Sequence, residues 1–364
     1  MLLKRLIIVL FSALLIFAAA LPLRSYAEDG IEDEITAEVD DILSAYDTGY
    51  SLGDTAGLSF SGFFGLIRER TVSRLTAPLR LLGTIILLSV LYSVFRSITS
   101  GGSAMSGSGL FGMISVMTAV TAIVPPLLGV YSSSLEAIRV TAGFMLVYVP
   151  VFAGITAFSG GLASAGIYHM MILAASELLL KLSGSYLLPV LTVCTVLSVS
   201  GSVFPNSSSE GIVRVLKKVI TLVISLTATL FSSFLSLKCT IAGKADSAGD
   251  KTIKMLLSGS VPVIGGAVSD AYSTVKCSLG VIRSTVGAAG IIAIAVLLLP
   301  PVIELLAYRL VMWIGTAAAE LFSASPIAGL LRSIDDGLSI AQCVMTAQCG
   351  MLMICTAIFI NAAE

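Results

Sequence analysis

The sequence is short of charged residues and has a single histidine. Of its 364 residues, 12% are charged and 56% are apolar, whereas soluble globular proteins have about 25% charged and about 45–50% apolar residues. This shortage of charge excludes an ordinary soluble domain. The apolar residues come in blocks of about 15 to 25, close to the length at which a helix crosses the ~30 Å hydrocarbon core of a bilayer. Because barrel strands are only about ten residues long and alternate in polarity, we expect an all-α membrane protein.

Motifs for metal binding, nucleotide binding and hydrolysis are also missing. His169 is the only histidine, so a Cys/His zinc site cannot be completed and imidazole-based catalysis has one candidate at most. No C-x-x-C occurs, and no P-loop, G-x-G-x-x-G, H-E-x-x-H or G-x-S-x-G stands in a fitting context. We therefore expect no enzyme activity, no cofactor, no metal and no nucleic-acid partner.

The six cysteines do not form an evident framework. They are Cys194, Cys239, Cys277, Cys343, Cys349 and Cys355. The last three recur every six residues, which places successive ones about 120° apart around a helix, so they share no face. We interpret the cysteines as reduced packing residues, with a disulfide between Cys239 and Cys277 as the alternative.

The first 27 residues have the layout of a signal peptide. Lys4 and Arg5 precede an apolar run, and small residues stand before Ala27. We predict cleavage after Ala27, with an uncleaved signal anchor as the alternative. Either way, residue 28 lies outside the cytoplasm.

An acidic segment follows the signal peptide. Residues 28–54 contain ten Asp and Glu and no Lys or Arg. Their apolar positions recur every three to four residues, which favours a short amphipathic helix. The acidic face is either simply solvated or a docking surface for an extracytoplasmic partner. With the arginine-bearing stretch that follows, residues 28–76 form the predicted extracytoplasmic segment.

Residues 77–364 form the predicted multipass membrane domain. We expect seven to nine transmembrane helices, with apolar cores near residues 81–95, 110–131, 140–158, 162–180, 186–203, 219–237, 286–307, 310–328 and 338–360. The orientation stays open, because basic clusters at 214–218 and 238–254 flank a single span and the positive-inside rule cannot place both in the cytoplasm.

Two proline pairs lie within apolar blocks. Pro125–Pro126 and Pro300–Pro301 each remove backbone donors, so we expect bent or broken helices there. Broken helices in two halves of a chain are typical of transporters built from repeats. A co-linear repeat is not evident in this sequence.

A few ionisable residues stand in apolar stretches. His169, Glu177 and Lys181 fit on one helix face and are either a structural group or part of a pathway through the bundle. Glu320 is isolated in another span. We expect interfacial solvation for Glu304 and Arg309, and a short polar connection made by Arg332, Asp335 and Asp336.

The stretch 254–285 is too apolar for an exposed loop and too rich in charges, glycine and proline for a span. We expect a re-entrant or interfacial broken element buried among helices, since irregular backbone at membrane depth survives only against protein or water.

This stretch also contains the sequence SVPVIGGAVSDAYSTVKCSLGVIRSTVGAAG, which resembles the stage III sporulation protein AE family of endospore-forming bacteria. The resemblance covers the order of features over nearly the whole chain and is most specific at 261–287. Its family-like residues are Pro262, Gly265, Gly266, Ser269, Asp270 and Gly287.

The resemblance implies a multipass protein of the mother-cell membrane that surrounds the forespore. It implies a secretion-like complex that links mother cell and forespore, with an ATPase and ring-forming subunits as partners. It transfers no catalytic residue. We therefore expect a non-enzymatic component of that channel, required for endospore development. The alternative is a stand-alone secondary transporter for a small solute, with the proline-broken helices and membrane carboxylates as its binding and coupling sites.

Overall fold

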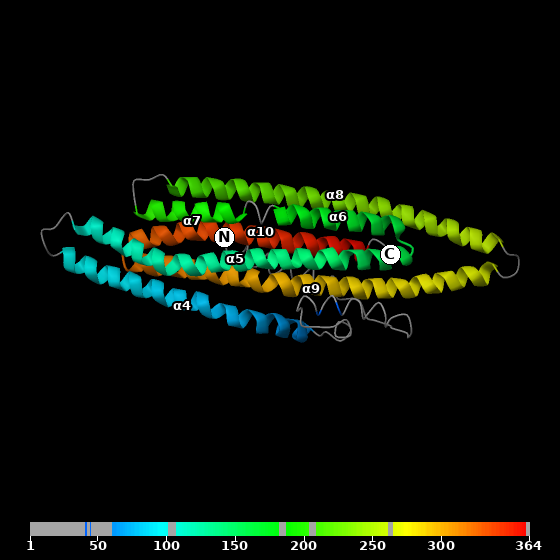
Figure 1. The fold of residues 1–364 in the computed structure, drawn as a ribbon, viewed down its shortest axis with the longest axis horizontal. Coiled ribbons are helices and arrows are strands. Elements are labelled where there is room, and N and C mark those ends of the chain that lie inside the picture. The colour runs from blue at the N-terminus through cyan, green and yellow to red at the C-terminus, as the bar shows by residue number, and fades with distance from the viewer. Residues whose placement is uncertain are drawn as a thin grey trace.

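The chain is a bundle of long helices in the computed structural model, which describes residues 60–100, 107–181, 187–203, 209–260 and 265–361, with Asp41 and Ser44. Within these residues every regular element is helical, which confirms the all-α fold (Figure 1). The helices are α4 Phe60–Ser100, α5 Gly107–Phe158, α6 Leu162–Lys181, α7 Leu188–Val203, α8 Ser209–Ser260, α9 Gly265–Leu321 and α10 Ser325–Asn361. The predicted signal peptide and most of the acidic segment lie outside the described residues.

The helices lie along one common axis and form an elongated bundle (Figure 1). The helix α10 contacts α5, α6, α7, α8 and α9, and α9 also contacts α4 and α5. In the most apolar part of α9, 72% of the residues are buried, and in that of α10, 67% are buried. In the most apolar part of α8, only 11% of the residues are buried. The core of the bundle is therefore the α9–α10 pair, and α8 lies on its outside.

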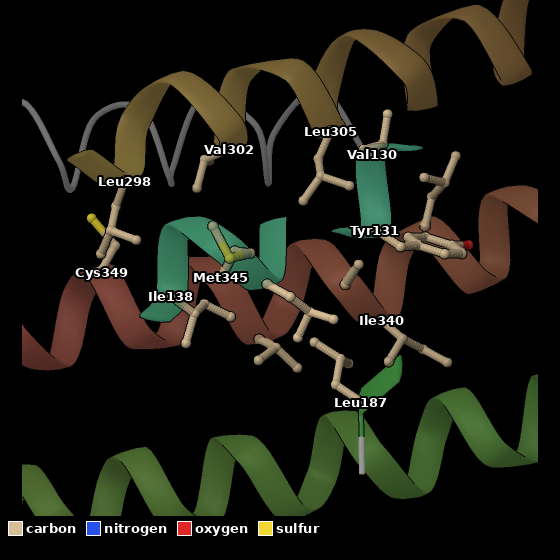
Figure 2. Close-up of a cluster of buried hydrophobic side chains, with 14 of the residues drawn as sticks. Val130, Tyr131, Ile138, Leu187, Leu298, Val302, Leu305, Ile340, Met345 and Cys349 are labelled. Atoms are coloured by element: carbon tan, nitrogen blue, oxygen red, sulfur yellow. The ribbon is translucent and has the colours of Figure 1, made fainter. Parts of the chain in front are cut away.

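Apolar side chains fill the space between these central helices. Figure 2 shows Leu298, Val302 and Leu305 of α9 above Met345 and Ile340 of α10. The same cluster includes Val130, Tyr131, Ile138, Leu187 and Cys349. Because lipid offers little hydrophobic drive for helix association, close packing of this kind holds membrane helices together.

Five described helices are long and apolar enough to span a membrane, so the count of seven to nine is not confirmed. One cause is that the blocks 110–131 and 140–158 join in the single helix α5. The serines between them do not interrupt it, because the hydroxyls of Ser132 and Ser134 donate to the carbonyl oxygens of Gly129 and Val130 within the helix. The block 286–307 and the first part of the block 310–328 join in α9 in the same way, and α9 ends at Leu321, inside the second block.

Both proline pairs lie inside continuous helices, so the helices are not broken there, and a bend at each pair stays a prediction. Pro125 and Pro126 lie within α5, and Pro300 and Pro301 lie within α9. Each proline removes only its own N–H donor, and packing against neighbouring helices can compensate for that loss in a membrane bundle.

The stretch 254–285 is helical wherever the structure describes it. The helix α8 continues to Ser260, and α9 begins at Gly265. Gly259, Gly265 and Gly266 therefore lie in helix, and the predicted irregular backbone is not found in the described part. The adjoining ends of α8 and α9 extend beyond the other helices at one end of the bundle (Figure 1). That this element lies at membrane depth stays a prediction.

Candidate functional site: ion pairs across the helical bundle

Several ion pairs join different helices of the bundle. Arg74 of α4 approaches Glu304 of α9 to 3.0 Å. Arg309 of α9 lies 3.0 Å from Asp335 of α10, and Lys217 of α8 lies 2.7 Å from Asp336 of α10. The side chains of Glu304 and Arg309 are only 13% and 15% exposed and are sheltered from solvent, whereas Arg74 is 41% exposed.

The neighbouring carboxylates of Asp335 and Asp336 tie α10 to two helices at once. Consecutive residues of a helix point about 100° apart, so one carboxylate faces α9 and the next faces α8. The prediction of a short polar connection here is wrong, because both residues lie inside α10. The connection between α9 and α10 is instead the turn at 322–324, where Ser323 has a φ of 57°.

The ionisable residues singled out from the sequence lie mainly on the outside of the bundle. Glu177 and Lys181 form an ion pair of 2.8 Å on α6, with side chains 69% and 72% exposed. His169 is half-buried on the same helix. Glu320 of α9 pairs with Arg332 of α10, and both are largely exposed. These groups do not converge in the interior of a single chain, so a pathway role for them stays a prediction.

The family-like block ends in a close helix crossing. The hydroxyl of Tyr148 on α5 donates a 2.6 Å hydrogen bond to the carbonyl oxygen of Val286 on α9. A methyl group on Gly290 would collide with the Tyr148 ring, and one on Gly287 would come within 2.5 Å of Ile360. Glycine at these two positions therefore lets α5 and α10 approach α9.

The beginning of the block has a different setting. Gly265 starts α9, Gly266 and Asp270 are exposed and Ser269 is half-buried. Pro262 lies outside the described residues. The carbonyl oxygens of Ser269 and Asp270 accept hydrogen bonds from Ser273 and Thr274 within the same helix.

Two aspartates on α8 were missed by the sequence analysis. Asp246 accepts hydrogen bonds of 2.8 and 2.9 Å from the backbone N–H groups of Ala163 and Ser164, and so caps the N-terminus of α6. Asp250 lies 2.9 Å from the Lys276 ammonium and accepts a 3.2 Å hydrogen bond from Tyr272. Local spacing could not reveal these contacts, because each joins two different helices.

The described residues offer no evident metal site. Among them, no group of three or more His, Cys, Asp and Glu side chains is placed to hold a metal ion. All six cysteines are free, so the alternative disulfide between Cys239 and Cys277 is absent from the structure. The geometry is that of helices held together by paired charges and close packing.

Comparison with known proteins identifies the family of the chain. The sequence model of the stage III sporulation protein AE family matches residues 49–363. The chain belongs to that family. The stage III sporulation protein AE of Bacillus subtilis (strain 168) is 21% identical over 248 residues, which is 68% of this chain and 62% of the relative. The match thus spans less than two thirds of that relative's length. No solved structure matches the chain.

The family match includes every ion pair and the glycine crossing described above. Membership in the stage III sporulation protein AE family associates the chain with sporulation, and its apolar helices are those of a membrane protein. The ion pairs and the glycine crossing can hold several helices in fixed positions relative to one another.

Proposed function

We propose that this family member is a non-enzymatic membrane component of the channel or secretion-like complex that links mother cell and forespore. The family match over residues 49–363 is the single observation that carries the sporulation role. The ion pairs that join α4, α8, α9 and α10 support a structural part in it, because they fix helices against one another instead of presenting a reactive group.

The location that fits this role is the mother-cell membrane around the forespore. The signal-like residues 1–27 would bring the N-terminal segment outside the cytoplasm. The acidic residues 28–54 would then face the space between the two membranes, where ring-forming subunits can meet them. An ATPase partner would supply the energy, since the chain has no P-loop.

We propose that Glu177, Lys181 and Glu320 line a pathway through the membrane only if another subunit packs against the surface that carries them. Within one chain they lie on the outer surface. Exposed charges in the hydrocarbon region are costly, so a protein or water environment suits them better than lipid.

Gene deletion in an endospore-forming host tests the proposed function. We expect loss of heat-resistant spores, restored by the full chain supplied in trans, and co-purification of the tagged chain with an ATPase and ring-forming membrane proteins. Normal sporulation of the deletion strain, together with loss of uptake of a small solute, would contradict the proposal and favour the secondary transporter.

A further inference from the structure

The outer face of α8 has a continuous row of exposed apolar side chains. This row, termed the α8 stripe, consists of Ile212, Val215, Val219, Leu222, Leu226, Leu230, Phe234, Leu237 and Ile241. Its members are between 47% and 69% exposed. They recur every three or four residues, so they lie along one side of the helix. The α8 stripe is thus a long apolar ridge that no described part of the chain covers.

The α8 stripe is longer than the hydrocarbon core of a bilayer is thick. From Ile212 to Ile241 the helix rises by about 44 Å, whereas the hydrocarbon core of a bilayer is about 30 Å thick. A tilt of about 40°, at the steep end for membrane helices, would still leave about 34 Å along the membrane normal. Apolar side chains at one or both ends of the stripe therefore lie beyond the hydrocarbon core, where a protein surface would shelter them from water.

A charged pair beside the α8 stripe also disfavours lipid. The helix α6 packs along α8, and its register is fixed by the Asp246 carboxylate at Ala163 and Ser164. From this cap, α6 and α8 run in opposite directions. Glu177 and Lys181, which are 14 and 18 residues after Ala163, therefore lie alongside the middle of the stripe, near Leu230. Both side chains are about 70% exposed. A charged pair at this depth is costly against lipid tails but not against protein or trapped water.

The surface next to the α8 stripe is suited to close helix packing. Ser225, Thr229 and Thr240 are exposed and small, and their hydroxyls donate to the carbonyl oxygens of Leu222, Ser225 and Ser236 on the same helix. These hydroxyls can leave water without losing their hydrogen bonds. Small residues at such spacing let membrane helices approach closely.

We propose that the α8 stripe packs in parallel against α8 of a second copy of this chain. Nine half-exposed apolar side chains offer on the order of 1,000 Å² to a partner, above the roughly 800 Å² per side of a stable interface. No charged residue occurs between 219 and 237, so the central part of the stripe has no charge pattern that would select a different partner. Copies inserted in one membrane share one orientation, so a two-fold contact places each stripe residue near its own counterpart.

Disulfide crosslinking tests this interface in intact membranes. Leu226→Cys is introduced into the full chain with Cys277→Ser, which removes the exposed native cysteine. The matched control is Leu87→Cys on α4, where Leu87 is also well exposed. On mild oxidation we expect a covalent dimer from Leu226→Cys at least several-fold more abundant than from Leu87→Cys. Equal crosslinking at the two positions, or an adduct of Leu226→Cys with a protein of another mass, overturns the proposal.

A bulky substitution gives an independent test that does not depend on cysteine chemistry. We expect the purified chain to have at least the mass of a dimer in mild detergent, and Thr229→Phe to shift it toward monomer by holding the helices apart. Thr118→Phe on α5 is the control, because Thr118 is also exposed and bonds within its own helix. A monomeric wild-type chain, or equal masses for both variants at unchanged helicity, contradicts the proposal and leaves lipid as the cover.

Discussion

The Tyr148 hydroxyl donates a 2.6 Å hydrogen bond to the Val286 carbonyl oxygen, and this contact fixes the crossing of α5 and α9. The Tyr148 ring fills the space left by the missing side chain of Gly290, and it stacks between Phe144 and Phe152 of its own helix. The crossing thus combines a buried hydrogen bond with a close approach that only glycine permits.

Gly290→Ala is expected to destabilise the bundle by about 1–3 kcal/mol, because the new methyl group collides with the Tyr148 ring. Thermal unfolding of the purified protein in detergent measures the effect. Gly280→Ala is the matched control on α9, since its added methyl group meets no atom within 4 Å and alanine favours the helix. Equal effects of the two substitutions would contradict the close crossing.

Asp335→Asn is expected to cost about 1–3 kcal/mol of stability, because it leaves the largely buried guanidinium of Arg309 without its charged partner. Urea-induced unfolding in detergent is the measurement. Glu136→Gln serves as the control, since Glu136 and Arg139 are both about 65% exposed and 3.9 Å apart, and exposed pairs contribute about 0–1 kcal/mol. An effect no larger than that of the control would show that the pair is not important for stability.

Asp246→Ala is expected to loosen the N-terminus of α6, because two backbone N–H groups lose their acceptor at a cost of about 1–2 kcal/mol. Hydrogen exchange of residues 162–168 should become faster while that of α10 stays slow. Asp270→Ala, which removes an exposed carboxylate from α9, is the control. Unchanged exchange in α6 after Asp246→Ala would rule out the cap.

The ends of α8 are expected on opposite sides of the membrane. Its uncharged stretch 219–237 would cover about 28 Å as a helix, close to the thickness of the hydrocarbon core. With Cys277→Ser, a membrane-impermeant thiol reagent should reach Gly211→Cys and Ser247→Cys from different sides. Labelling of both from one side would exclude a crossing by α8.

Composition and block length were enough to predict the helical membrane class, and residues 260–290 were enough to suggest the family. They could not show that Ser132 and its neighbours continue a helix, since serine hydroxyls that bond to their own helix look the same in sequence as those of a loop. The pairing of Lys217 with Asp336 joins residues 119 positions apart. No local periodicity encodes such a contact, so the charged residues at 335 and 336 resembled a connection.

A charge swap between Lys217 and Asp336 tests most directly the claim that paired helices serve spore formation. Lys217→Asp and Asp336→Lys are each expected to lower the count of heat-resistant spores at least tenfold, because each replaces an opposite-charge pair, 2.7 Å apart in the wild type, with two like charges at the same helix contact. The double variant restores the opposite pair, and we expect it to recover most of the count. Normal counts in both single variants, or a double variant no better than either while the protein is present in the membrane, would contradict the account.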